Sequence, residues 1–134
     1  MTRHEIKNYI KKKYKVVAVS LWEDAPGYIV FRNGKKKWFG IIMDVPYSKV
    51  YKKLNDKNSS LKQKNTKKYA DDEIIDVMNV KLAPDMVASI RKQKGFAEAY
   101  HMNKKHWVSI DIEKVQNKKI TDLIDISFNI VKGK

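Results

Sequence analysis

Apolar positions recur at helical spacing near both ends of the chain. The first group begins after Thr2 and Glu5, which have the spacing of a capping box, and it predicts a helix from Arg3 to Lys13. The apolar positions of this helix are Ile6, Tyr9, Ile10 and Tyr14. The second group predicts a long closing helix, because one stripe of its surface carries Ile120, Leu123, Ile124, Phe128 and Val131.

Between these two helices, apolar runs bounded by turn residues predict five strands. The strands are expected over Tyr28–Arg32, Lys37–Val45, Glu73–Leu82, Phe96–Met102 and His106–Ile112. Asn33 and Gly34 separate the first two strands and form a strong hairpin signal, because both residues tolerate a positive φ. A second hairpin is expected around Asn103, Lys104 and Lys105.

Two further segments complete the pattern. Pro84, at a first helical position, opens a helix that Gly95 ends. The segment at about 47–72 is different, with a short helical turn predicted near Ser48–Leu54 and a lysine-rich loop after it. Such a lysine-rich run is usually a solvated insertion and less often an arm that binds anions.

The order of these elements is helix, three strands, helix, two strands and helix. It favours a single α+β domain over residues 1–134. Helices segregated to one face of an antiparallel sheet give a two-layer architecture, here in the order α-β(3)-α-β(2)-α. We expect all three helices to cover one face of the sheet, which leaves the other face, or the hairpin tips, in contact with solvent.

Composition adds a strong positive charge to this picture. The chain of 134 residues has 29 lysines and arginines against 15 aspartates and glutamates, so its net charge is +14 at pH 7. Such a field attracts polyanions, and nucleic acid, an anionic membrane and an acidic protein all qualify. Most of the basic residues are lysines, since only Arg3, Arg32 and Arg91 are arginines. Lysine suits contact with phosphates better than the reading of guanine edges. A lysine-rich proteome would explain part of the same excess.

The residue types also exclude several classes of site. The chain has no cysteine, which excludes disulfides, iron–sulfur clusters and thiolate zinc sites. Its apolar runs are short and broken by charge, and the N-terminus lacks the apolar stretch of a signal peptide. We therefore expect a cytoplasmic protein that is a monomer and has no membrane partner.

Several stretches resemble the MmcQ/YjbR family. They are Trp22–Arg32 with Lys37–Pro46, then Asp76–Lys81, and most specifically Gly95–Ser109. The last stretch contains the uninterrupted run Tyr100-His101-Met102-Asn103-Lys104-Lys105-His106-Trp107. The resemblance covers nearly the whole chain from Trp22 onward, but the segment at about 47–72 is longer and richer in lysine than is usual in the family.

The resemblance implies a fold like that of the type III secretion chaperones and, more loosely, of CyaY. It also implies the family's description as double-wing DNA-binding proteins, with the two hairpins as the wings. Basic tips beside aromatic rings suit phosphate contact combined with stacking. The nucleic-acid-binding residues would then be Lys35, Lys36, Lys37, Trp38, Tyr100, His101, Asn103, Lys104, Lys105, His106 and Trp107. Aromatic residues in strands are more often part of a core, and lysines at hairpin tips also serve solubility.

His101 and His106 allow another interpretation, because a tight hairpin would bring them face to face. Two imidazoles can bind a metal or act as acid and base. However, the spacing fixes no third ligand, and the intervening Lys104 and Lys105 repel a cation. A hydrogen bond to a neighbouring strand, or a part in anion binding, is the more ordinary role, so we expect no metal and no cofactor.

Three functions remain open at this point. The first is a small module that binds nucleic acid (DNA) mainly through phosphates. The alternative is a protein-interaction or adaptor module that docks an acidic protein. An enzyme with a pocket at His101 and His106 is not favoured, because no glycine-rich phosphate loop and no motif for a catalytic nucleophile or metal is present.

Overall fold

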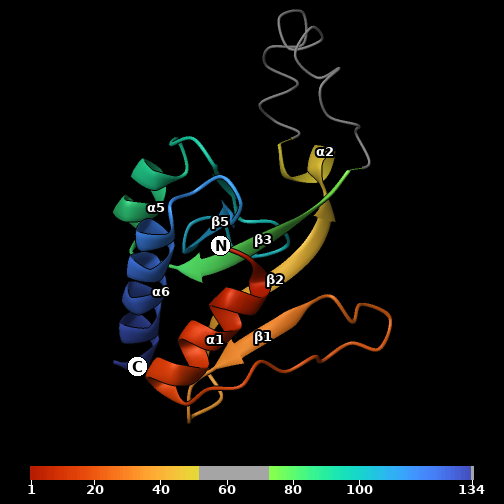
Figure 1. Cartoon of the computed structure of the whole chain (residues 1–134). Helices are drawn as coiled ribbons and strands as arrows, with labels where there is room; N and C mark the ends of the chain where they lie inside the picture. The colour runs from red at the N-terminus through yellow and green to blue at the C-terminus, as the bar shows by residue number, and fades with distance from the viewer. Residues whose placement is uncertain (52–72, 134) are drawn as a thin grey trace, which may run out of the picture.

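The computed structural model describes residues 1–51 and 73–133. Its elements follow the order predicted from the sequence, and α2 corresponds to the short helical turn expected after the second strand (Figure 1). They are α1 (Arg3–Tyr14), β1 (Ile29–Arg32), β2 (Trp38–Pro46), α2 (Tyr47–Val50), β3 (Ile74–Lys81), α5 (Pro84–Ile90), β4 (Phe96–Glu98), β5 (Trp107–Asp111) and α6 (Asn117–Lys132). The α+β class is thus confirmed.

The strands form one antiparallel sheet in the order β1-β2-β3-β5-β4. Arg32 at the end of β1 lies opposite Trp38 at the start of β2. Lys81 at the end of β3 lies opposite Trp107 at the start of β5. Because β2 and β3 are also antiparallel, these four residues mark the same end of the sheet, which we call the turn end.

One face of the sheet, the helical face, packs against the helices. In Figure 1, α1 and α6 lie on the same side of the sheet. Ile6 and Ile10 of α1 are fully buried, as predicted from their spacing, and they join the stripe of α6 in one core with Phe31 and Phe39. The α6 stripe buries Ile120, Leu123, Ile124 and Val131. This core is the main apolar cluster of the domain.

Specific polar contacts fix the helices onto this face. The hydroxyl of Ser127, which is fully buried on α6, donates to the carbonyl of Phe39 at 2.6 Å and accepts from the backbone N–H of Lys81 at 2.8 Å. A backbone N–H and a carbonyl that the helix would otherwise desolvate are therefore satisfied.

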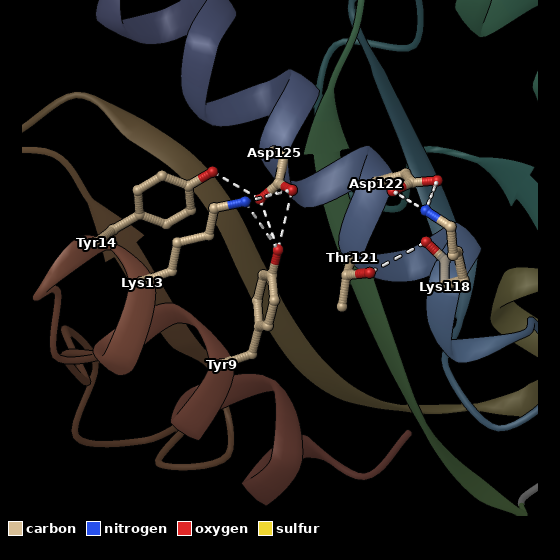
Figure 2. A network of polar contacts seen from close by, with 7 residues as sticks. All are labelled: Tyr9, Lys13, Tyr14, Lys118, Thr121, Asp122 and Asp125. Atoms are coloured by element: carbon tan, nitrogen blue, oxygen red, sulfur yellow. Dashed lines mark hydrogen bonds and ion pairs between the residues drawn. The ribbon is translucent and has the colours of Figure 1, made fainter.

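Asp125 of α6 collects a second set of contacts (Figure 2). Its carboxylate accepts from the hydroxyls of Tyr14 at 2.6 Å and Tyr9 at 2.9 Å, and pairs with the ammonium of Lys13 at 2.8 Å. Burial on its own would raise the pKa of Asp125, but these three partners outweigh it and hold the pKa below the ordinary value. The network joins the C-terminal half of α1 to the middle of α6.

The opposite face of the sheet, the loop face, has a separate apolar cluster. It contains Val30, Ile41, Met43, Val45 and Val77, together with Tyr51 after α2. Apart from Trp38 of β2, the residues packed against it come from loops and from α2, and include Tyr28, Tyr47, Tyr100 and Met102. Of the two alternatives stated above, an exposed face and exposed hairpin tips, the structure therefore favours the second.

The short helix α2 comes directly after β2, close to the position predicted from the sequence. The remainder of the helical turn predicted to Leu54 and the lysine-rich loop that follows it lie outside the described residues.

Candidate functional site

The connection between β1 and β2 is a tight, exposed, basic turn. Its first residue, Asn33, organises it, because the side-chain oxygen accepts from the backbone N–H groups of Lys35 at 2.9 Å and Lys37 at 3.0 Å. The backbone carbonyl of Asn33 accepts from Lys36 at 2.9 Å. Lys35, Lys36 and Lys37 are all exposed, which agrees with their predicted place at a hairpin tip.

The hairpin predicted at this turn is confirmed, because β1 and β2 pair antiparallel on either side of it, but its backbone conformation has one unexpected feature. The residue with a positive φ is Lys36, at 65°, and neither Asn33 nor Gly34 adopts one. The physical reason is the side chain of Asn33, which accepts from two N–H groups and thereby moves the left-handed residue to the end of the turn. A bulge between Phe31 and Arg32 accompanies this change.

The connection between β4 and β5 differs from the tight hairpin predicted. The strand expected to reach Met102 ends at Glu98, and the chain then folds back over the loop face. The buried amide of Asn79 donates to the carbonyl of Tyr100 at 3.0 Å, and the buried Ser109 hydroxyl accepts from the Tyr100 N–H at 3.0 Å. Both backbone groups of Tyr100 are therefore held by the sheet, which explains why the strand ends early.

The next residue turns the chain. His101 has a φ of 60°, a left-handed conformation that is uncommon for a residue with a side chain. Beyond it, the side chain of Asn103 accepts from the N–H of Lys105 at 2.8 Å, so this connection repeats the asparagine-based turn of the first. Lys104 and Lys105 are exposed, and the Lys104 ammonium donates to the carbonyl of Ala99 at 3.2 Å.

Both lysine-bearing connections lie at the turn end of the sheet. The β1–β2 and β4–β5 pairs are separated by three strand spacings of about 4.8 Å, so their midlines are about 14 Å apart. Two further cations, Arg32 and Lys81, end strands at this same edge. The sequence analysis did not identify Arg32 and Lys81 as candidate site residues, because their position beside the turns depends on strand order and register. The only signal in the sequence was that β1 and β3 each end on a basic residue.

A cavity of about 460 Å³ opens on the loop face between the segment 22–28 and the β4–β5 connection. Trp22, Tyr28 and Trp38 supply its aromatic surface. The ring of Trp22 makes edge contacts with Tyr28 at 6.2 Å and Trp38 at 6.0 Å, measured between centroids. Burial first, and the neighbouring Tyr100 second, raise the pKa of Tyr28. Ile41 and Met43 of β2 also line the cavity.

The polar groups that line this cavity come from two loops. Asp24 belongs to the segment before β1, and His101 and Asn103 belong to the β4–β5 connection. His106, in contrast, does not line it, so the cavity is not the paired-histidine pocket considered from the sequence. Within residues 1–51 and 73–133, no group of three or more histidine, aspartate or glutamate side chains is placed to bind a metal ion.

The aromatic residues predicted at the interface have different environments. Trp38 and Tyr100 are half-buried, whereas Trp107 is buried, with 8% of its surface exposed. Trp107 therefore has the ordinary role of a strand aromatic residue, that of core packing. The structure brings Trp38, His101 and Asn103 to the cavity, and Lys35, Lys36, Lys37, Lys104 and Lys105 to the basic turns beside it.

A model of the YjbR family matches residues 11–130 of the chain. The protein belongs to the YjbR family. It is 31% identical to the uncharacterized protein YyaQ of Bacillus subtilis, over 98% of this chain and 99% of that protein. The resemblance stated from the sequence is therefore confirmed.

Solved structures show the same YjbR fold. A crystal structure of a Pseudomonas syringae protein is 32% identical, with a TM-score of 0.81 over 98% of this chain and 99% of that one. The Deinococcus radiodurans protein DR2400 shares the fold at 17% identity, with a TM-score of 0.68 over 99% of this chain and 80% of that one. Among the helices that the structure describes here, none has the length and apolar character needed to cross a membrane.

Proposed function

We propose that this YjbR-family protein binds nucleic acid through its phosphates, with the turn end of the sheet as the contact surface. The observation that supports this most directly is that the register brings both lysine-bearing connections to one end of the sheet. Two such connections, on strand pairs whose midlines are about 14 Å apart, can contact phosphates on one strand or across a groove.

The charges at this end support the proposal. Besides Lys104, whose ammonium donates to the carbonyl of Ala99, six cations belong to this end and are exposed or half-exposed, namely Arg32, Lys35, Lys36, Lys37, Lys81 and Lys105. Glu98, which ends β4 at the same end of the sheet, is engaged with Arg91 at 3.2 Å. A cluster of lysines with few arginines favours phosphate contact over the reading of base edges, so weak sequence preference is expected.

The test is fluorescence anisotropy of the full chain with labelled duplex DNA across a salt series. If the six cations contact phosphates, the slope of log K against log salt is about −5. The double variant Lys35→Gln with Lys37→Gln should make this slope shallower by about 2. A matched control, Lys118→Gln with Lys119→Gln, removes the same charge from the N-terminal end of α6, distant from the turn end, and should leave the slope unchanged.

Two outcomes would overturn the proposal. One is an equal loss of binding in the two double variants, which would mean that net charge alone attracts the DNA. The other is that heparin competes as well as DNA at matched salt, while a discrete acidic protein is retained after nuclease treatment. That result would favour the adaptor alternative over nucleic acid.

A further inference from the structure

We propose that the cavity on the loop face accommodates one unpaired base of a single-stranded nucleic acid, with the neighbouring phosphates at the two lysine-bearing connections. This inference rests on the proposed function and names the class of nucleic acid it prefers. It assigns a task to a part of the loop face where the described residues leave space next to the basic turns.

The cavity lies between the two lysine-bearing connections. Trp38, which lines it, directly follows Lys37 of the first connection. Asn103, which lines it from the other side, directly precedes Lys104 and Lys105 of the second. A nucleotide whose base enters between these walls therefore has ammonium groups on both sides of its sugar and phosphates.

The size of the cavity and the side chains of its walls suit a nucleic-acid base. A volume of about 460 Å³ lies within the range of sites for small organic ligands, about 300–1,000 Å³. Trp22 remains 37% exposed, and with Trp38 it offers aromatic surface on which any base can stack. Asp24 supplies acceptors, and Asn103 supplies an amide that can donate and accept, which suits the polar edge of a base.

The same geometry argues against a cationic occupant. Three aromatic residues beside a carboxylate can form a cage for a quaternary ammonium group. Here, however, the ring of Trp22 makes direct edge contacts with Tyr28 and with Trp38, at centroid distances of 6.2 Å and 6.0 Å, so no ammonium group fits between Trp22 and either of these rings. The net charge of +14 further favours an anionic ligand.

The wall formed by the second connection is built in advance of any ligand. Ser109 and Asn79 hold the N–H and the carbonyl of Tyr100, and the Ser109 hydroxyl donates to the amide oxygen of Asn79. This fixes the chain immediately before His101 and Asn103 enter the lining. A wall that needs no ordering upon binding lowers the entropic cost of accommodating a base.

The test compares a short single-stranded DNA with an abasic strand of the same length and charge, by anisotropy of the full chain at about 50 mM salt. The base-bearing strand should bind about tenfold more tightly, because stacking adds to phosphate contact. In Trp22→Ala, the two strands should bind with about equal affinity. The matched control is Leu21→Ala, at a neighbouring residue that is 43% exposed and does not line the cavity, and it should leave the ratio unchanged.

Different results of this experiment would contradict the base site and the proposed phosphate binding. Equal affinity for the two strands would overturn the base site while phosphate binding remained. Loss of binding to both strands at low salt would overturn the proposed function itself. A mononucleotide such as GMP should displace the strand only at far higher concentration, and displacement at similar concentrations would show that the site serves free nucleotides instead.

Discussion

The two faces of the sheet contain similar apolar residues but are covered in different ways. The helical face is closed by α1 and α6, whose side chains interlock with Phe31 and Phe39. The loop face is closed by irregular segments and retains a cavity of about 460 Å³. Regular helices present side chains at fixed spacing and pack to high density, whereas loops held by a few hydrogen bonds leave room for a ligand. The comparison predicts that stability resides mainly on the helical face, whereas the space for the proposed ligand lies on the loop face.

The largest expected effect comes from truncating a buried side chain on each face. Phe39→Ala should lower the free energy of unfolding by about 4 kcal/mol, because it removes a fully buried ring that contacts Tyr14 and Phe128. Met43→Ala, equally buried but lining the cavity, should cost about 2 kcal/mol. Urea denaturation measures both, and equal losses would remove the energetic distinction between the faces.

A smaller effect is expected from two buried serines that have similar contacts on opposite faces. Ser127→Ala should cost about 2 kcal/mol, because it leaves the Lys81 N–H and the Phe39 carbonyl without their partner. Ser109→Ala should have a similar cost and should also release Tyr100, which reduces the affinity ratio between base-bearing and abasic strands. That ratio should remain unchanged in Ser127→Ala, and a fall in both variants would contradict separate roles for the faces.

The smallest effect concerns pH and the helical face. The pKa of Asp125 is lower in the folded protein than its ordinary value of 3.8, so its contribution to stability is present above that pH and is lost as the pH falls through the folded value. In Asp125→Asn, the urea midpoint should therefore fall less steeply below about pH 4 than in the wild type. Asp122→Asn, which removes a more exposed carboxylate from the same helix, is the control. If the urea midpoints of wild type and Asp125→Asn fall in parallel as the pH is lowered, Asp125 does not cause the acid sensitivity.

Much of the architecture could be predicted from local patterns. The stripes on α1 and α6 and the apolar runs of β1, β2, β3 and β5 are properties of neighbouring residues, so periodicity identified them to within a few positions. The same holds for the lysines at 35–37, because the Asn-Gly signal depends on four consecutive residues.

The loop face could not be predicted in this way. Its cover depends on Asn79 and Ser109 reaching the backbone of Tyr100, and these contacts span 21 and 9 residues of sequence, beyond the reach of local periodicity. The early end of β4 at Glu98 is a consequence of that contact, because the pattern of residues up to Met102 is compatible with a longer strand. The same limitation hid Arg32 and Lys81, whose place beside the turns is fixed by strand order.

The tryptophans of this protein lie on the loop face of the sheet, so their fluorescence reports on that face alone. The chain has three, and Trp22 and Trp38 line the cavity while Trp107 shares the side of β5 that carries Ser109. Intrinsic indole emission therefore reports on the loop face, whereas far-ultraviolet circular dichroism is dominated by α1 and α6. If the indole signal changes at a lower urea concentration than the dichroism, the loop face opens while the helices remain folded.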